Sequence, residues 1–163
     1  MLNEVLLDAL NTQINKEIFS SYLYLSMSAH FEANNLPGFA KWTRLQSQEE
    51  YGHAMKMFDF IIDRGNEVTL QAIDQPPVKF GTPLEVFEHI YSHEKVVTGL
   101  IHSLYSLALK EADYPSQIML QWFVNEQVEE EKNSSQVVEM LKMAGNNMSI
   151  VMMLDGHLGK RGG

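Results

Sequence analysis

Four long segments of the chain carry apolar residues at every third or fourth position, the spacing of one face of an α-helix. We predict helices over about residues 4–33, 38–65, 83–111 and 114–144, and a short apolar fifth helix over about 148–159. The sequence has no β-type alternating run. The predicted fold class is therefore all-α.

Residues typical of helix ends support these boundaries. In "NNLPG", Pro37 suits the first position of a helix. Thr82, Pro83 and Glu85 supply an N-cap, a first-turn proline and the acid of a capping box. Gly145 is typical of the residue that ends a helix.

The lengths of the connections predict how the helices are arranged. Short turns make the first and second helices, and likewise the third and fourth, antiparallel neighbours. The stretch 66–82, "NEVTLQAIDQPPVKFGT", exceeds the usual loop of about 4 to 6 residues and can cross the length of a bundle. We predict a four-helix bundle with one long crossover and a short fifth helix, forming a single domain over residues 1–163.

Composition narrows the chemistry. The chain has no cysteine, which removes disulfides, thiolate metal sites and a cysteine nucleophile and fits a reducing compartment. Its net charge of −9 favours cations as partners over nucleic acid. Neither a signal peptide nor an apolar run of about 20 residues is present, so we expect a protein of the cytoplasm without a membrane partner.

Each long helix has polar residues near its midpoint, within its apolar stripe. They are Glu17 on the first helix, Glu50 and His53 on the second, Glu94 on the third, and Gln127 and Glu130 on the fourth. Midpoints of equally long helices share a layer of a bundle, so we expect these side chains to meet. The i, i+3 spacing puts both members of each pair on one face.

Four carboxylates in an apolar core would each cost several kcal/mol without compensation. Two divalent cations would cancel their charge, with Glu50 as the natural bridge between the ions. Oxygen donors with a single imidazole suit Fe or Mn better than structural Zn, although Zn²⁺ can compete. The pattern therefore predicts a two-metal centre.

Further residues adjoin this layer. Glu49, Glu126 and Glu129 each precede a predicted ligand by one residue and, with Glu130, could hold another cation. Tyr24, on the face of Glu17, has two open roles, as a packed and hydrogen-bonded core residue or as an electron donor.

Apolar residues outside the inward stripes suggest association between chains. Phe19, Tyr22 and Leu23 lie off the predicted inward face of the first helix, and "SIVMMLDGHL" is an apolar segment after the bundle. The alternative is that this segment packs on its own bundle.

Glu17, "EEYGH" at 49–53, Glu94 and "EQVEEE" at 126–131 together resemble the bacterial non-haem ferritins, over nearly the whole chain. The resemblance implies a first iron site of Glu17, Glu50 and His53, and a second of Glu50, Glu94 and Glu130 with Gln127 nearby. It also implies a third iron site, whose residues would be Glu49, Glu126, Glu129 and Glu130. The implied activity is oxidation of Fe²⁺ by O₂ or H₂O₂, a ferroxidase reaction, with storage of the ferric mineral in a homo-oligomeric shell of 24 chains.

Two features differ from related families. Tyr51 stands where bacterioferritins have a haem-binding methionine, so no haem is expected. The fourth helix has Gln127-x-x-Glu130 in place of a second Glu-x-x-His pair, which implies that iron passes through the centre. Two alternatives remain at this point: a di-iron or di-manganese oxidase of an organic substrate, and a structural or signalling helical bundle.

Overall fold

The computed structural model describes residues 1–162, which form five α-helices and no β-strand. The helices are α1 (Glu4–Ala33), α2 (Pro37–Asp63), α3 (Pro83–Lys110), α4 (Tyr114–Ala144) and α5 (Met148–Leu158). The predicted all-α bundle with a short fifth helix is confirmed. No helix in this part of the chain is both long and apolar enough to cross a membrane.

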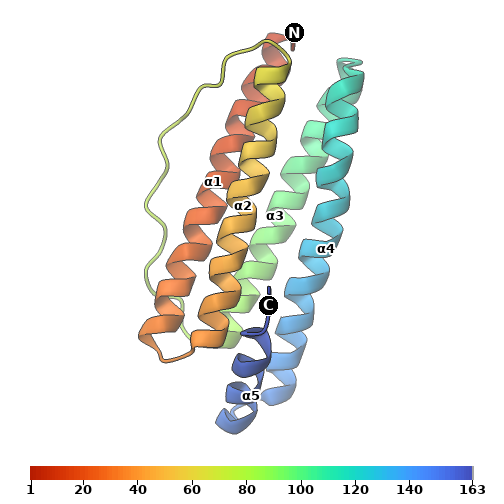
Figure 1. Ribbon diagram of the computed structural model, residues 1–163. Coiled ribbons are helices and arrows are strands. Elements are labelled where there is room, and N and C mark those ends of the chain that lie inside the picture. Colours follow the sequence, from red (N-terminus) through yellow and green to blue (C-terminus); the bar gives the residue numbers. More distant parts are fainter. Residues whose placement is uncertain (163) are drawn as a thin grey trace.

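The bundle consists of two helical hairpins, α1 with α2 and α3 with α4 (Figure 1). The connection from α2 to α3 runs the length of the bundle beside α1, so α2 and α3 point the same way (Figure 1). Side chains of α1 hold this connection in place. Asn15 Nδ2 donates to the Ala72 carbonyl at 2.9 Å, and Asn11 Oδ1 accepts from the Thr69 amide at 3.0 Å.

Side-chain caps fix the helix starts and therefore the register of the bundle. Thr82 and Glu85 form a reciprocal capping box at the start of α3. Asp113 caps α4 through the Ser116 amide and also accepts two hydrogen bonds from Arg64 at the end of α2, at 2.7 and 2.8 Å. This pair ties the hairpins together at one end.

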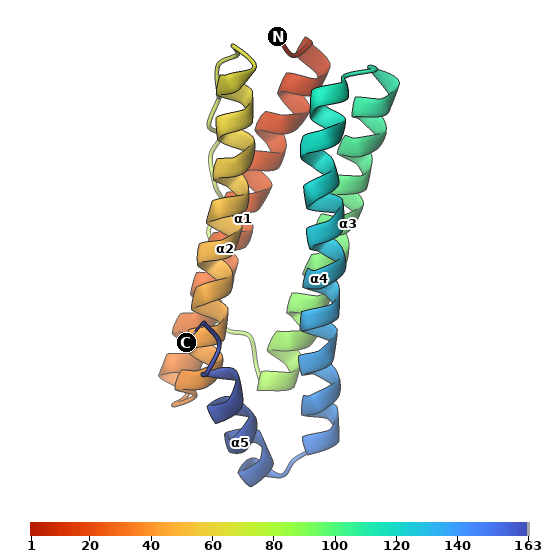
Figure 2. The ribbon, with the colours of Figure 1, turned by 45° about the vertical axis from the view of Figure 1, so that its right-hand side comes forward.

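The start of α2 has no cap from its own N-cap residue, Leu36. Asp155 of α5 supplies one instead, because its Oδ1 accepts from the Phe39 amide at 2.9 Å. The helix α5 thereby lies across the end of the bundle, in contact with α2 and α4 (Figure 2). Its own residues Val151 and Leu158 are buried.

The outer side of α5 stays apolar and exposed, as at Met148, Met152 and Met153. The C-terminal helix thus packs on its own bundle and still presents an apolar surface. Packing of this segment on its own bundle is confirmed, and association between chains through its exposed side stays a prediction.

The apolar core has two halves with a polar layer between them. One half, around Phe31, Phe39 and Phe87, lies toward α5, and the other, around Leu10 and Ile101, lies toward the opposite end. Buried polar residues occupy the middle, among them Glu17, Gln46, Glu50, Glu94, Gln127, Glu130 and Ser134. The predicted convergence of the polar side chains at one level is therefore present.

The buried face of α1 differs from the stripe that the sequence predicts. Steps of four residues from Glu17 predict that Leu25 faces inward, but Leu25 is 45% exposed. Leu23, predicted to lie off the face, is 2% exposed. The prediction was wrong because α1 packs on both α2 and α3. Its buried face is wider than one stripe and is centred differently. Tyr22 lies outside it, as predicted, and is exposed.

Candidate metal centre

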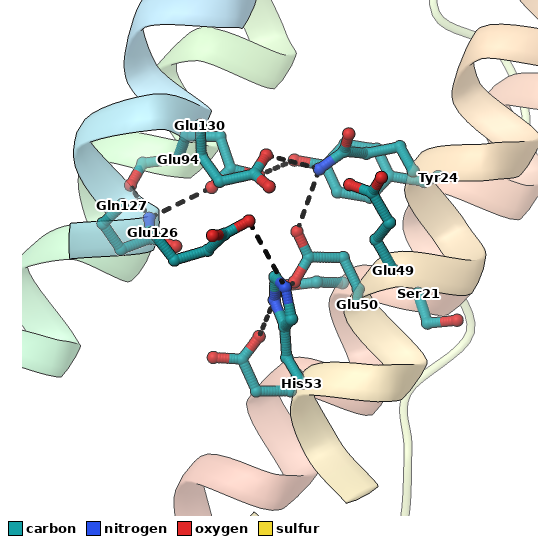
Figure 3. Close-up of polar contacts among 12 residues, drawn as sticks. Ser21, Tyr24, Glu49, Glu50, His53, Glu94, Glu126, Gln127 and Glu130 are labelled. Atoms are coloured by element: carbon teal, nitrogen blue, oxygen red, sulfur yellow. Dashed lines mark hydrogen bonds and ion pairs between the residues drawn. The ribbon is translucent and has the colours of Figure 1, made fainter. Parts of the chain in front are cut away.

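Four acidic side chains from four different helices meet in the polar layer. Glu17, Glu50, Glu94 and Glu130 are all buried. Glu50, Glu94 and Glu130 point toward one another together with His53 (Figure 3). Two groups of three, both containing Glu50, place one potential ligand atom of each residue within 4.8 Å of the others.

The first group is Glu17, Glu50 and His53. His53 Nδ1 lies 3.1 Å from Glu50 Oε2 and 4.0 Å from Glu17 Oε2. Gln13 Nε2 donates to Glu17 Oε1 at 3.0 Å, whereas Glu17 Oε2 is buried without a hydrogen-bond partner among the described residues. A buried carboxylate oxygen without a partner is costly, and a cation between Glu17 and His53 would satisfy it.

The second group is Glu50, Glu94 and Glu130. Gln46, one turn before Glu50, joins two of them, since its Nε2 donates to Glu50 Oε1 at 3.2 Å and to Glu130 Oε2 at 2.5 Å. The shared residue Glu50 therefore has one oxygen toward each group. This is the geometry that a carboxylate bridge between two ions requires.

The side chain of Glu94 is held by two donors. The Tyr24 hydroxyl donates to Glu94 Oε1. The Gln127 amide Nε2 donates to Glu94 Oε2 at 3.1 Å and to the Glu94 carbonyl oxygen at 3.2 Å. Gln127 thus contacts a candidate ligand and lies outside the metal-binding groups of the described residues.

Burial and mutual repulsion make these carboxyls weak acids. Burial, followed by repulsion from Glu94, raises the pKa of Glu130 to about 8. Burial also raises the pKa of Glu94 to about 7, and that of Glu50 well above its ordinary range. Burial and the charge of Glu94 raise the pKa of the Tyr24 hydroxyl. The cluster favours positive charge, either protons or bound cations.

The residues assigned to a third site are only partly brought together. Glu126 and Glu130 form a group with His53, whose Nε2 lies 3.9 Å from Glu126 Oε1. Glu49 forms an ion pair with Arg161 at 2.9 Å instead. Among the described residues, neither Glu49 nor Glu129 belongs to a metal-binding group.

Sequence reasoning did not identify the amide donors Gln13 and Gln46. Each lies four residues before a candidate ligand, a spacing at which a glutamine can hydrogen-bond the following acid on the same helix face. This signal was present in the sequence. The guanidinium of Arg161 had no comparable signal.

The half-buried His93, beside Glu94 in the sequence, belongs to none of the metal-binding groups of the described residues. Its Nε2 is hydrogen-bonded to Ser20 Oγ at 2.8 Å, and its ring meets Tyr24 edge-on. Burial lowers the pKa of His93 to about 4, so the ring is neutral. Trp122 covers His53 edge-to-face and is 37% exposed.

Comparison with known proteins gives the family. Residues 7–144 match the family model of the ferritin-like domain. The chain belongs to the ferritin family. It is 46% identical to a bacterial non-haem ferritin of Bacteroides fragilis, over 99% of this chain and 100% of that protein. A bacterial non-haem ferritin of Staphylococcus saprophyticus is 37% identical, over 99% and 96% of the two chains.

The fold also agrees with solved ferritin structures. An open pore ferritin from the hyperthermophilic archaeon Archaeoglobus fulgidus superposes with a TM-score of 0.98 at 46% identity, covering 99% of both chains. A ferritin of the same organism, engineered to a closed form, superposes with a TM-score of 0.97. The resemblance of this sequence to the bacterial non-haem ferritins is thereby confirmed.

Proposed function

We propose that this ferritin stores iron by oxidising Fe²⁺ inside its helical bundle and depositing the ferric product within a shell of 24 chains. The observation that carries the proposal is that two buried clusters of potential metal ligands, each of three residues, share Glu50. Relatives named bacterial non-haem ferritin support the storage role.

Two Fe²⁺ ions are the proposed occupants of the centre, as substrate. Glu17, Glu50 and His53 would bind the first ion, and Glu50, Glu94 and Glu130 the second. Two ions of charge +2 balance four carboxylates, which removes the cost of burying four uncompensated charges. Gln127 holds Glu94 and belongs to neither ligand group, so the second ion would lack an imidazole ligand and would be held less firmly than with one.

The proposed reaction takes one electron from each of two Fe²⁺ ions. The two electrons reduce one O₂, which with two protons gives H₂O₂, and two Fe³⁺ ions remain. Alternatively, H₂O₂ accepts the two electrons and, with two protons, gives two water molecules. Carboxylate oxygens favour the harder Fe³⁺ ion, and hydrolysis of Fe³⁺ then forms the mineral. Both electrons come from the iron ions, so this reaction needs none from Tyr24, whose hydroxyl positions Glu94 by donating a hydrogen bond to it.

A third cation is proposed to bind among Glu49, Glu126, Glu129 and Glu130. Glu126 already lies with Glu130 and His53, so the change required is an inward turn of Glu49 and Glu129.

The proposed location of the protein is the cytoplasm. The exposed apolar residues Met152 and Met153 of α5 are proposed to lie between chains of the shell.

An oxidase of an organic substrate would need a pocket that reaches the metals. The pocket between α3 and α4, lined by His102, Tyr105 and Asn125 among others, contains none of the candidate ligands. Iron oxidation far beyond two ions per chain would exclude such an oxidase, because its metals are retained.

The test is stopped-flow Fe²⁺ oxidation by the variant Glu50→Ala. Loss of the shared ligand is expected to reduce oxidation to the rate of Fe²⁺ in buffer, with native mass and helix content unchanged. Glu139→Ala is the control, because Glu139 is exposed and its one ion pair among the described residues is with Lys142, across one helical turn. Oxidation by Glu50→Ala at the wild-type rate would contradict the proposal.

A further inference from the structure

The guanidinium of Arg161, beyond the end of α5, reaches back to the middle of α2. Its Nη1 donates to the Trp42 carbonyl at 3.1 Å, and its Nη2 donates to Gln46 Oε1 at 2.9 Å. The same Nη2 lies 2.9 Å from Glu49 Oε2. The group also lies over the Trp42 ring, 4.5 Å from its centre.

Arg161 is placed there by the docking of α5. Asp155 caps the start of α2 through the Phe39 amide. Gly159 packs against Gly38 so closely that a Cβ at Gly159 would lie 3.0 Å from the Gly38 Cα atom. The chain therefore leaves α5 directly beside α2, and Arg161 follows two residues later.

Arg161 orients an amide that reaches the metal centre. Gln46 is buried, and its Oε1 accepts from Arg161 while its Nε2 donates to Glu50 and Glu130. If the amide turned over, its oxygen would face two carboxylates and its NH₂ group would face a guanidinium. The charge on Arg161 therefore excludes that orientation.

Arg161 also holds Glu49, a residue of the proposed third cation site. The other two acids that precede a candidate ligand, Glu126 and Glu129, have no such arginine among the described contacts. Glu126 lies near His53, whereas Glu49 is turned to the guanidinium. A cation that recruits Glu49 must displace this guanidinium or share its carboxylate.

We propose that Arg161 is a positioning residue that competes with the third cation for Glu49. Until the cation displaces it, Arg161 keeps the Gln46 amide directed at Glu50 and Glu130. The inference rests on the proposed function, since it assumes cation sites at these carboxylates. Binding of the third cation withdraws Glu49 from Arg161. The C-terminal segment loosens from α2, and Gln46 becomes free to release Glu130.

Calorimetric titration of the assembled, metal-depleted protein with Zn²⁺ tests the competition without redox chemistry. Arg161→Gln is expected to bind the third Zn²⁺ equivalent about fivefold more tightly than the wild type, which is about 1 kcal/mol at 1.4 kcal/mol per tenfold. The first two equivalents are still expected to bind before it. Arg161→Lys keeps the charge and is expected to stay within about twofold of the wild type. Arg44→Gln is the control for net charge, since Arg44 is exposed and pairs with no acid in the described part of the chain.

The fluorescence emission of Trp42 provides a second test, because it would not respond to the third cation if Arg161 had only a structural role. In a Trp122→Phe background, Trp42 is the only tryptophan, and the third Zn²⁺ equivalent is expected to change its emission as the guanidinium leaves the ring. Arg161→Gln should abolish this change. A third equivalent of equal affinity in the wild type and Arg161→Gln, or a Trp42 signal that persists in Arg161→Gln, would overturn the inference alone. Failure of the first two equivalents to bind would overturn the proposed function as well.

Discussion

The substitution Gly38→Ala tests the docking of α5 on the start of α2. A Cβ at this position would lie 1.7 Å from the carbonyl oxygen of Asp155. That oxygen belongs to the backbone, so no side-chain rotation relieves the contact. Ordinary van der Waals contact begins at 3.4 Å, and the two backbones must therefore separate by about 1.7 Å.

The separation has two costs. Overpacking at a tight contact typically costs about 1–3 kcal/mol. The cap from Asp155 to the Phe39 amide, now 2.9 Å long, would also be stretched, and loss of such a cap costs about 1 kcal/mol. A total of about 2–4 kcal/mol corresponds to a Tm lower by about 4–16 °C for a chain of this size.

The measurement is thermal unfolding by circular dichroism at one fixed protein concentration. Gly52→Ala is the matched control on the same helix, because a Cβ at Gly52 meets nothing within 4 Å. Its alanine is expected to raise stability by about 0.5–1 kcal/mol, since glycine weakens a helix interior. A Tm for Gly38→Ala equal to or above that of the wild type would refute the close contact between α2 and α5.

Three further predictions concern other contacts. Tyr24→Phe removes the hydroxyl donor to Glu94, and calorimetry should show about tenfold weaker binding of the second divalent cation, because hydrogen bonds to charged groups contribute about 1.5–3 kcal/mol. Hydrogen bonds from Arg64 hold the pKa of Asp113 well below its usual range. The pair therefore contributes its full stabilisation above about pH 4, and this contribution falls as the pH drops further and Asp113 becomes protonated. Asp113→Asn should therefore lower the free energy of unfolding by about 2 kcal/mol at about pH 7, and urea titrations should show this difference shrinking below about pH 4. Thr82→Ala removes half of the capping box of α3 and should cost about 1 kcal/mol in thermal unfolding, whereas Thr82→Ser should retain most of the stability.

The fold was predictable because its determinants are local. The apolar period, the cap at Thr82 and the long connection before it act within one helix or one loop, and they suffice to give the topology. The width of a buried face is not local. Whether Leu23 or Leu25 of α1 is buried depends on where α2 and α3 lie against it.

The residues of the candidate centre were predictable for a similar reason. A glutamate within an apolar stripe is conspicuous, and four helices of similar length bring such residues to one level. The surroundings were harder to predict. Arg161 and Gln46 lie 115 residues apart, and only the docking of α5 brings them together. Even the Gln46–Glu50 spacing, visible in the sequence, does not show that the amide also reaches Glu130 on another helix.

The division of the apolar core into two halves has a consequence for repeated use of the protein. Phe31, Phe39 and Phe87 close one end of the bundle, and Leu10 and Ile101 close the other, without help from the acids between them. Departure of bound ions from the middle would remove no packing that either end depends on. Each cycle of the proposed oxidation would therefore begin from an intact scaffold, and chemistry and transport would set its rate without any refolding step.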